Sequence, residues 1–332
     1  MGFDVVTVGR VSMDLYSRQI GAEFTDVESF DAMIGGSPSN IAIGTARLGA
    51  RSAVLTAVGP DEIGRFVMAN FAREGVSTEH IRTVEGTRTG LAIVGMQPPD
   101  HFPLTFYREN PADIHLTCDD VDRLPLADTR IVSLAGTGLS RGTCKEATLY
   151  AGERAAAMEI PTVLIDLDLR PDQWIDRRGY GTAIRALLEH IDVAIGTEEE
   201  FHAALAPASE ALDGGPLSDT GKDELDGLIG ALRDHRPDIV VVLKRGSRGV
   251  TVMTGEGNLD VEGYPVDVLN TVGAGDAFAS GLIHGMLQNW DWRRTARFAN
   301  ACGAIEVTRH GCSSAMPTVD EVMDFVEDRD GL

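Results

Sequence analysis

Short apolar runs alternate with segments of helical periodicity along most of the chain. The apolar runs predict strands at Asp4–Val8, Ala53–Val58, Arg130–Leu134, Thr162–Ile165, Val193–Ile195, Ile239–Leu243 and Val250–Met253. The periodic segments between them predict helices, including Asn40–Leu48, Gly64–Glu74, Cys144–Met158 and Glu198–Leu205. Continuous Val, Ile and Leu strands that alternate with amphipathic helices are typical of a parallel sheet covered on both faces. We therefore predict an α/β fold in which a mostly parallel central sheet is flanked by helices.

Two segments interrupt this alternation. Residues 11–36 and about 88–112 mix polar and apolar positions, with short alternating stretches at Thr89–Gly95 and Leu104–Tyr107. Strict alternation is typical of strands with one exposed face. A small separate sheet lying over the main domain explains both segments, and a pair of long surface loops explains them as well.

Acidic side chains dominate the charge of the protein. The chain has 332 residues, and 51 Asp and Glu outnumber 29 Lys and Arg, for a formal net charge of −22. Such a surface repels phosphate backbones and anionic lipids, which argues against nucleic acid or a membrane surface as a partner. No apolar run approaches the roughly 18 residues of a membrane span. The 4 cysteines form no CxxC pair, so we expect neither a disulfide framework nor a zinc site, and a cytoplasmic protein.

A glycine-rich segment, NTVGAGD from Asn270 to Asp276, is the first candidate for phosphate chemistry. It lies between a strand-like Val266–Leu269 and a helix of small and apolar residues. Gly-Ala-Gly at a helix start leaves N–H groups unpaired, and the helix dipole adds positive potential, so the segment suits a phosphate. A carboxylate beside a phosphate repels it, so a general base is the role that explains Asp276. A glycine-rich turn with an ordinary N-terminal acid explains the same residues.

A second glycine pair precedes another predicted helix. Gly35 and Gly36 in GGSPSN allow a ligand to approach the backbone closely, and the Asn40 side chain both donates and accepts hydrogen bonds. Asp14 in GRVSMD follows the first strand and has acceptors for two hydroxyls. Together these residues suit a sugar or another polyol. A tight turn followed by a capped helix is the structural alternative.

Two further segments contain the residue types of a nucleotide site. Lys244, Gly246 and Gly249 in KRGSRG lie between two apolar runs, where they form either a hairpin turn or a loop beneath a nucleotide. Thr197 and Glu200 in TEEE begin a helix, where acids favour the helix dipole. A carboxylate at the end of a strand has a second use, which is to hold water on Mg²⁺.

Two arginines are candidates for binding a carboxylate. Arg108 in TFYREN and Arg170 in DLDLRP have guanidinium groups that can form bidentate hydrogen bonds. Arginines are also common as solvated surface residues. On so acidic a protein, these two are the best physical argument for an anionic ligand.

Several common catalytic motifs are absent from the sequence. No GxGxxG follows the first strand, so a dinucleotide-binding domain is unsupported. Gly221 and Lys222 lack both the following Ser or Thr and the earlier glycine of a P-loop. HExxH is also absent, which removes the simplest zinc-protease interpretation.

In their order along the chain, these motifs resemble those of the ribokinase-like (PfkB) family of sugar kinases. The resemblance covers essentially the whole chain through GRVSMD, GGSPSN, TEEE, KRGSRG, NTVGAGDAFASG and ANACGAIEVTRHG. One branch, the 5-dehydro-2-deoxygluconokinases of myo-inositol catabolism, is resembled further in IGGSPSNIAIG, YREN, SLAGTGLS, IDLDLRPDQW, IGTEEEF and HGCSSAMPTVDEV. The resemblance implies one ribokinase-like three-layer kinase domain over residues 1–332, with a β-sheet lid from the insertions at about 11–36 and 88–112.

The resemblance also implies a role for each candidate residue. Asp276 would be the general base that deprotonates the acceptor hydroxyl. An anion hole for the transferred group would be formed by the amides of Gly273, Ala274 and Gly275. The sugar would be held by Asp14, Gly36, Asn40, Arg108 and Arg170. The ATP site would be lined by Lys244, Gly246, Gly249, Asn300 and Thr197. Water on Mg²⁺ would be oriented by Glu200.

The implied activity is ATP-dependent transfer of the γ-phosphoryl group to the C6 hydroxyl of 5-dehydro-2-deoxygluconate. The alternatives are a 2-dehydro-3-deoxygluconokinase, a fructokinase, or a non-catalytic sugar-binding regulator. The expected cofactors are ATP and Mg²⁺. Relatives have a monovalent-cation (K⁺) site where this chain has Asn270 in place of the commoner Asp, which leaves K⁺ dependence open. Lid sheets in relatives often pair subunits, so a homodimer is a further expectation.

Overall fold

The computed structural model describes residues 2–98, 101–206, 219–329 and 331–332. Within these ranges nine strands form one sheet, in the order β13-β12-β11-β10-β9-β8-β1-β4-β5. Their bounds are β1 Val5–Val8, β4 Ser52–Val58, β5 Ile81–Thr83, β8 Ile131–Ala135, β9 Thr162–Asp166, β10 Val193–Thr197, β11 Val240–Lys244, β12 Val250–Thr254 and β13 Gly257–Val261. Neighbouring strands are parallel, except that β12 is antiparallel to both β11 and β13. The mostly parallel sheet predicted from the apolar runs is confirmed.

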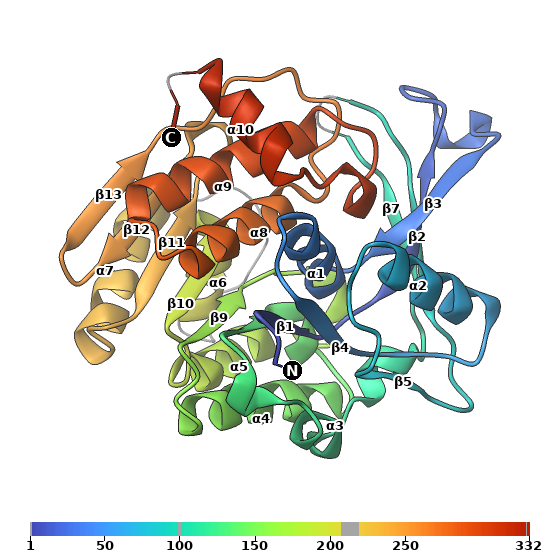
Figure 1. Ribbon diagram of the computed structural model, residues 1–332, viewed down its shortest axis with the longest axis horizontal. Coiled ribbons are helices and arrows are strands. Elements are labelled where there is room, and N and C mark those ends of the chain that lie inside the picture. The colour runs from blue at the N-terminus through green and yellow to red at the C-terminus, as the bar shows by residue number, and fades with distance from the viewer. Residues whose placement is uncertain (1, 99–100, 207–218, 330) are drawn as a thin grey trace.

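Helices cover both faces of this sheet (Figure 1). The orange helices α8 (Ala274–Leu287) and α9 (Trp292–Val307) lie on one face, and the green helices α4 (Cys144–Ala157) and α5 (Arg178–Leu188) lie on the other. The remaining helices are α1 Ser37–Arg47, α2 Glu62–Arg73, α3 Cys118–Asp122, α6 Glu198–Leu205, α7 Asp219–His235 and α10 Val319–Glu327. The predicted helices correspond to α1, α2, α4 and α6. Among the described residues, no helix has both the length and the apolarity that a membrane crossing requires.

Successive residues of a strand enter different cores, which explains the continuous apolar runs. On β9, Val163 and Ile165 belong to the core that includes α4 and α5, whereas Leu164 belongs to the core that includes α8. On β1, Val6 and Val5 divide in the same way. Because successive side chains point to opposite faces and both faces are buried, these strands are mostly apolar rather than alternating, with Thr7 as a buried exception on β1 and Thr162 and Asp166 at the two ends of β9.

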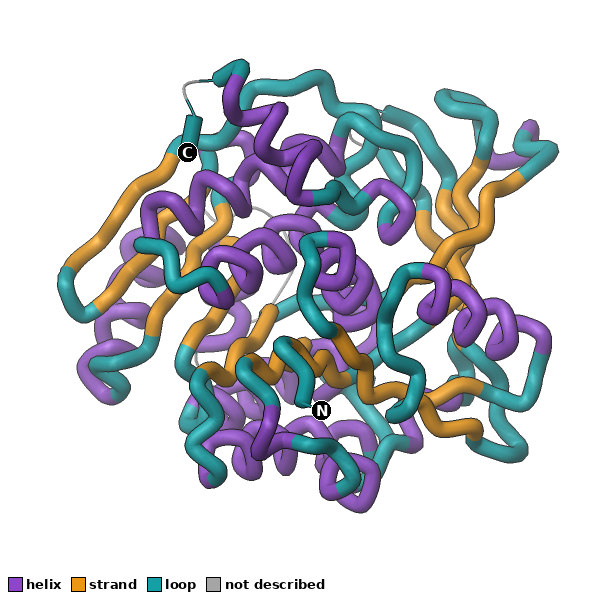
Figure 2. The backbone as a smooth tube through the Cα atoms, viewed as in Figure 1, coloured by secondary structure: helices purple, strands orange, loops and turns teal. Residues whose placement is uncertain are grey.

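A second, smaller sheet lies to one side of the main sheet (Figure 2). Its strand order is β3-β2-β6-β7, with bounds β2 Ser12–Ser17, β3 Phe30–Gly35, β6 Gly90–Val94 and β7 Leu104–Tyr107. β2 pairs antiparallel with β3 and parallel with β6, and β6 pairs antiparallel with β7. These strands arise from the two segments that interrupt the alternation of strands and helices. The prediction of a small separate sheet is therefore confirmed, and the alternative of two surface loops is wrong.

One predicted strand, Val266–Leu269, is wrong. Residues 262–268, which follow β13, form no strand. The N–H groups of Leu269 and Asn270 both donate to the Val307 carbonyl at the end of α9, over 2.8 and 3.1 Å. Pro265 has no N–H to contribute to a sheet ladder. The apolar side chains of this segment face a cavity instead of a sheet neighbour.

Candidate active site

The candidate residues gather where neighbouring parallel strands end. β9, β10 and β11 lie side by side in the sheet and end at Asp166, Thr197 and Lys244. Thr197 and Lys244 are directly paired in register. Ligands of open α/β sheets bind outside the carboxyl ends of the strands. The sheet therefore delivers a lysine and a carboxylate to the edge where a ligand is expected.

The glycine-rich segment NTVGAGD leads into the first turn of α8 beside this lysine. Gly273 precedes the helix with a φ of 106°, in the left-handed region that favours glycine. A Cβ there would lie 2.4 Å from Cys312 Sγ and 2.6 Å from Glu306 Oε1. A Cβ on Gly275 would lie 3.2 Å from Lys244 Nζ, so the amine is close to the helix N-terminus. An ammonium beside a helix N-terminus suits a phosphate.

Asp276 lies in that first turn and is held by α1. Asn40 Nδ2 donates to Asp276 Oδ2 over 2.7 Å. Burial raises the pKa of Asp276 and the charge of Asp168 raises it further, whereas Asn40 and Arg170 lower it. The net shift is upward, which makes Asp276 a stronger base than an ordinary aspartate at the same position.

The residues predicted to hold a sugar meet at the junction of the small sheet with α1. Gly36 precedes α1, and a Cβ on it would lie 2.6 Å from the Arg10 carbonyl oxygen. Asp14, on β2, is buried and accepts a 2.6 Å hydrogen bond from Ser12 Oγ. The Oδ1 atom of Asn40 is buried without a hydrogen-bond partner among the described residues. Asn40 therefore supports Asp276 with its amide nitrogen and keeps an acceptor for a ligand.

The two predicted carboxylate-binding arginines both have acidic partners inside the protein. Arg108 is buried, and its Nη2 donates to both oxygens of Asp113 over 2.8 and 2.9 Å. Arg170 Nε lies 3.1 Å from Asp168 Oδ1, but 46% of the Arg170 side chain is exposed. The charge of Asp168 raises the pKa of Arg170. Arg108 is thus occupied, whereas Arg170 keeps an accessible side for a ligand.

A cavity of about 580 Å³ adjoins the lysine and the first turn of α8. The predicted site residues that line it are Thr197, Lys244, Gly246, Gly249, Ala274, Gly275 and Asn300. Its apolar lining includes Tyr264, Pro265, Val266, Val268, Phe278 and Val307. The volume is in the range of ligand pockets. Apolar walls beside an amine and helix amides suit a ligand with a flat base and a phosphate chain.

The KRGSRG segment is a hairpin, as one of its two interpretations from the sequence predicted. It connects the antiparallel pair β11 and β12 as a hairpin, with a short 3₁₀ turn at Gly246–Arg248. It also contributes Gly246 and Gly249 to the lining of the cavity.

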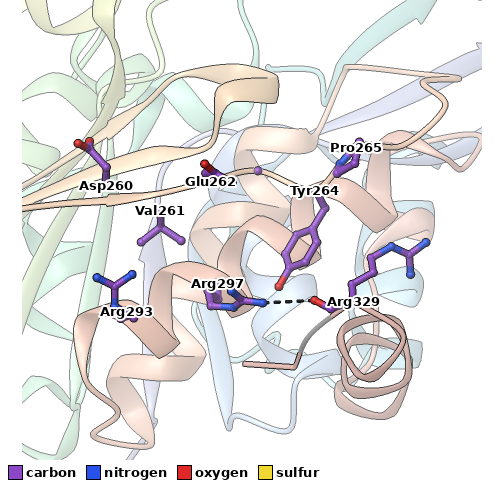
Figure 3. A pocket seen from close by; sticks show the side chains of 9 residues that line it. Asp260, Val261, Glu262, Tyr264, Pro265, Arg293, Arg297 and Arg329 are labelled. Carbon is purple, nitrogen blue, oxygen red and sulfur yellow. Dashed lines mark hydrogen bonds between the residues drawn. The ribbon is translucent and has the colours of Figure 1, made fainter.

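Residues 263–265 form part of one wall of this cavity, and side chains of α9 contact this segment and the residues before it. Asn300 Nδ2 donates to the carbonyls of residues 261 and 262 over 3.3 and 3.0 Å. On the outer side, the guanidinium of Arg297 lies 5.8 Å from the Tyr264 ring centre and donates to the Arg329 carbonyl (Figure 3). Tyr264 also lines an outer cavity of about 550 Å³. Asn300 therefore orders the wall as well as lining the cavity.

Lys244 is balanced by two acids. Its Nζ lies 3.3 Å from Asp166 Oδ2 and 3.9 Å from Glu200 Oε2. Burial lowers the pKa of Lys244, but Asp166 and Glu200 raise it by more, so the amine stays charged. Burial raises the pKa of Asp166, and Lys244 opposes that shift.

Glu200 also closes the start of α6. Its Oε2 accepts the Thr197 N–H over 2.8 Å, and Thr197 Oγ1 accepts the Glu200 N–H over 3.2 Å, which is a capping box. Its Oε1 accepts the Leu169 N–H over 3.2 Å. The helix-start interpretation of TEEE is therefore confirmed. Each carboxylate oxygen has a second lone pair for water, so the cap does not prevent a role beside a cation.

Proteins of similar sequence decide the family. The family model described as pfkB family carbohydrate kinase matches residues 3–319. The chain belongs to the pfkB family of carbohydrate kinases. A 5-dehydro-2-deoxygluconokinase of Geobacillus kaustophilus is 32% identical to it over 98% of this chain and 93% of the relative. A Clostridium perfringens protein of the same name is 32% identical with the same coverage.

Solved structures agree with this pfkB assignment at the level of the fold. A candidate ribokinase II from E. coli, in complex with ATP and Mg²⁺, superposes with a TM-score of 0.85 at 24% identity, covering 99% of this chain and 100% of that one. A fructokinase of Xylella fastidiosa with bound ATP gives a TM-score of 0.82 at 24% identity, covering 98% and 99%. The ribokinase-like fold is therefore confirmed.

Three polar residues of this carbohydrate kinase site were not predicted. Asp166 and Asp168 come from DLDLRP, where β9 ends, and Arg10 comes from the end of β1. Asp168 has a φ of 30° and accepts a 3.0 Å bond from Thr137 Oγ1. The available signal was position, because polar residues directly after buried parallel strands lie at the ligand edge of the sheet.

Proposed function

We propose that the protein is a kinase that transfers the γ-phosphoryl group of ATP to the C6 hydroxyl of 5-dehydro-2-deoxygluconate. The hydrogen bond between Asn40 and Asp276 is the observation that carries this proposal. It holds a carboxylate of raised pKa in the first turn of α8, where the Lys244 amine lies close to Gly275. The names of the curated relatives support the choice of substrate.

The proposed chemistry is an in-line displacement at the γ-phosphorus. Asp276 takes the proton of the acceptor hydroxyl while the hydroxyl oxygen bonds to the γ-phosphorus. The bond between the γ-phosphorus and the bridging oxygen breaks, and ADP leaves with that oxygen. The amides of Gly273, Ala274 and Gly275 and the ammonium of Lys244 stabilise the charge on the transferred group. Phosphoryl transfer depends mainly on positioning and on such electrostatic stabilisation.

ATP would occupy the cavity of about 580 Å³, with Thr197, Gly246, Gly249 and Asn300 along its walls. Mg²⁺ is usually bound by few protein carboxylates and several waters. Glu200 fits that role, since each of its carboxylate oxygens keeps a lone pair for water beyond the backbone N–H that it accepts. Bound Mg²⁺ would neutralise the developing phosphate charge.

A K⁺ ion does not fit the side chain of Asn270. Its Nδ2 donates to the carbonyls of Gly311 and Val272 over 2.6 and 3.2 Å, and its Oδ1 accepts the Val272 N–H over 3.0 Å. The amide places a donor against carbonyls where a carboxylate would attract a cation. The proposed mechanism therefore gives K⁺ no role.

On the sugar side, Asp14, Gly36 and Asn40 would hold hydroxyl groups. Arg170 would face the carboxylate of the acceptor with its exposed side. The small sheet would serve as a lid that excludes water from the transfer and so limits hydrolysis of ATP.

The test is ADP release from Mg-ATP with 5-dehydro-2-deoxygluconate, 2-dehydro-3-deoxygluconate, fructose and ribose as acceptors. We expect clear preference for the first. Asp276→Asn should lower kcat by about 10²–10⁴-fold, the usual contribution of a general base, and still bind ATP and sugar. Preference for another acceptor would contradict the substrate. A protein that binds the sugar without turnover would be a regulator.

A further inference from the structure

Arg10 is a buried cation to which no carboxylate of the described residues is bonded. It follows β1 at the carboxyl end of the strand, and only 7% of the residue is exposed. Among the described residues, its Nε and Nη1 atoms are buried and have no hydrogen-bond partner. A buried guanidinium whose N–H groups have no acceptor is costly to the fold, because it has lost its hydration and gained no hydrogen bond in return. Such a group is retained most readily where a ligand supplies the acceptor.

The acids around Arg10 are committed to other groups. Asp168 pairs with Arg170 over 3.1 Å and accepts from Thr137. Asp14 accepts from Ser12. Burial lowers the pKa of Arg10, and the charges of Arg108 and Arg170 lower it further, whereas the charges of Asp168 and Asp14 raise it; the net shift is downward. Arg10 thus differs from Arg170 in having no carboxylate bonded to it.

Arg108 is paired with Asp113, and the two side chains support the backbone next to Arg10. Asp113 Oδ2 accepts the N–H of Val11 over 2.9 Å, and Arg108 Nη1 donates to the Val11 carbonyl over 3.1 Å. The Arg108–Asp113 pair therefore holds the peptide groups next to Arg10. Arg108, which the sequence indicates as a carboxylate ligand, fixes the backbone from which Arg10 extends.

A second unpartnered donor lines the same space. Gln173 is 6% exposed, and its Nε2 is buried without a partner among the described residues. Arg10 and Gln173 both line a cavity of about 10 Å³, together with Thr137, Arg141 and the ion pair of Arg108 and Asp113, whose acid is neutralised by its arginine. That volume suits one water-sized group. A carboxylate oxygen has this size, and a carboxylate only accepts hydrogen bonds, which matches two donors better than a hydroxyl does.

The small sheet fixes the guanidinium from its other side. The Arg10 guanidinium carbon lies 5.3 Å from the ring centre of Phe106 on β7. A ring face attracts the cation but offers no acceptor for the N–H groups. The plane of the guanidinium is thus held while its donors remain available.

We infer that Arg10, with the amide of Gln173, binds the carboxylate of the acceptor and selects a sugar acid over a neutral sugar. This inference rests on the proposed function, since it concerns the same acceptor. Arg170 remains at the accessible side of the site, and Arg108 acts through the backbone at Val11.

The experiment compares wild type with Arg10→Met, Arg10→Lys and the surface control Arg18→Gln. The measured quantity is the ratio of kcat/KM for 5-dehydro-2-deoxygluconate to that for fructose. Loss of a charge-assisted hydrogen bond costs about 1.5–3 kcal/mol, so Arg10→Met should lower the ratio by about 10–100-fold. Arg10→Lys should give a ratio between those of wild type and Arg10→Met, because lysine keeps the positive charge but lacks the paired N–H donors of a guanidinium. Arg18→Gln should leave the ratio unchanged.

Thermal unfolding gives a second readout that separates ligand binding from a structural role. Without ligand, Arg10→Met should be at least as stable as wild type, because it removes a buried cation that lacks a partner. With the same concentration of 5-dehydro-2-deoxygluconate alone, the melting temperature of wild type should rise by more than that of Arg10→Met. A ligand-free Arg10→Met that is less stable than wild type and gains as much from the sugar acid as wild type does would overturn the inference.

The outcomes for the two proposals differ. A wild-type preference for the sugar acid that Arg10→Met retains would overturn the role of Arg10 and leave the proposed function standing. A wild-type preference for fructose would overturn both the proposed substrate and the role of Arg10.

Discussion

Asn40 and Asp276 are 236 positions apart in the chain, yet Asn40 Nδ2 donates to Asp276 Oδ2 over 2.7 Å. The contact is possible because α1 and α8 pack closely at Gly44, where a Cβ would lie 2.2 Å from Ser280 Oγ. Ser280 Oγ in turn donates to the Asp276 carbonyl over 2.8 Å. The helix pair therefore fixes both the backbone and the carboxylate of the proposed base.

Asn40→Ala should move the acid limb of the pH profile to higher pH. The Asn40 amide stabilises the ionised form of Asp276, so its loss raises the pKa of the base beyond the rise that burial already causes. The base is active when ionised, so activity on the acid side is lost first. The measurement is kcat/KM against pH, with a fall of about tenfold in kcat from the lost charged hydrogen bond.

Asn70→Ala is the matched control for Asn40→Ala. The Asn70 side chain donates to the Phe66 carbonyl within α2 and has no place in the site. Its pH profile should match wild type. An Asn40→Ala profile that also matches wild type would contradict the role of the amide.

Asp276→Asn should not lower, and should tend to raise, the free energy of unfolding at pH 8. Burial raises the pKa of Asp276 in the folded protein, so the ionised carboxylate disfavours the fold once the pH exceeds that raised pKa. This penalty disappears as the pH falls below the ordinary aspartate value of about 3.9. Urea unfolding of both proteins gives the difference in free energy of unfolding between Asp276→Asn and wild type. This difference should be present at pH 8 and largely absent at pH 4.

Asp31→Asn should lower the free energy of unfolding at pH 8, which is the opposite of the effect expected for Asp276→Asn. Arg18 donates to Asp31 and lowers the pKa of that carboxyl. Its ionised form therefore supports the fold above the ordinary aspartate pKa, although solvent screening keeps the effect small. If Asp276→Asn destabilised the protein at pH 8 as Asp31→Asn should, the interpretation of Asp276 as a carboxylate whose burial raises its pKa and destabilises the fold would be wrong.

Thr197→Ala and Thr318→Ala should cost similar stability but differ in activity. Each threonine accepts the N–H of a glutamate three residues later, Glu200 in α6 and Glu321 in α10. Loss of such a cap costs about 1 kcal/mol. Only Thr197 lines the large cavity, so only Thr197→Ala should raise the KM for ATP. Equal KM values for the two variants would contradict the assignment of the cavity to ATP.

Gly273→Ala should be among the most damaging single methyl additions in the chain. It places a Cβ against Cys312 and Glu306, at a φ of 106° that costs about 1–2 kcal/mol for other residues. We expect loss of kcat together with a lower melting temperature. Gly230→Ala in α7 meets nothing within 4 Å and should stabilise by about 0.5–1 kcal/mol. An active, stable Gly273→Ala would contradict the anion-hole geometry.

The sequence by itself was enough to predict two kinds of element: strands that are buried on both faces, and helix starts whose contacts lie within one turn. Strands such as β9 are recognisable because both faces are buried, so the central positions Val163, Leu164 and Ile165 are all apolar. The start of α10 is recognisable because Thr318 and Glu321 satisfy each other within one turn. The first turn of α8 is recognisable because NTVGAGD contains both its glycines and its acid.

Only the tertiary structure decided which polar side chains have hydrogen-bond or ion-pair partners elsewhere in the protein. Val266–Leu269 has the composition of a strand, but its last residue, Leu269, donates to the end of α9. Arg108 has the chemistry of a carboxylate ligand but is occupied by Asp113, whereas the Nε and Nη1 of Arg10, in GRVSMD, are buried and have no acceptor among the described residues. Hydrogen-bond partners lie across the fold, as for Asn40 and Asp276, so periodicity and motif spacing carry no record of them.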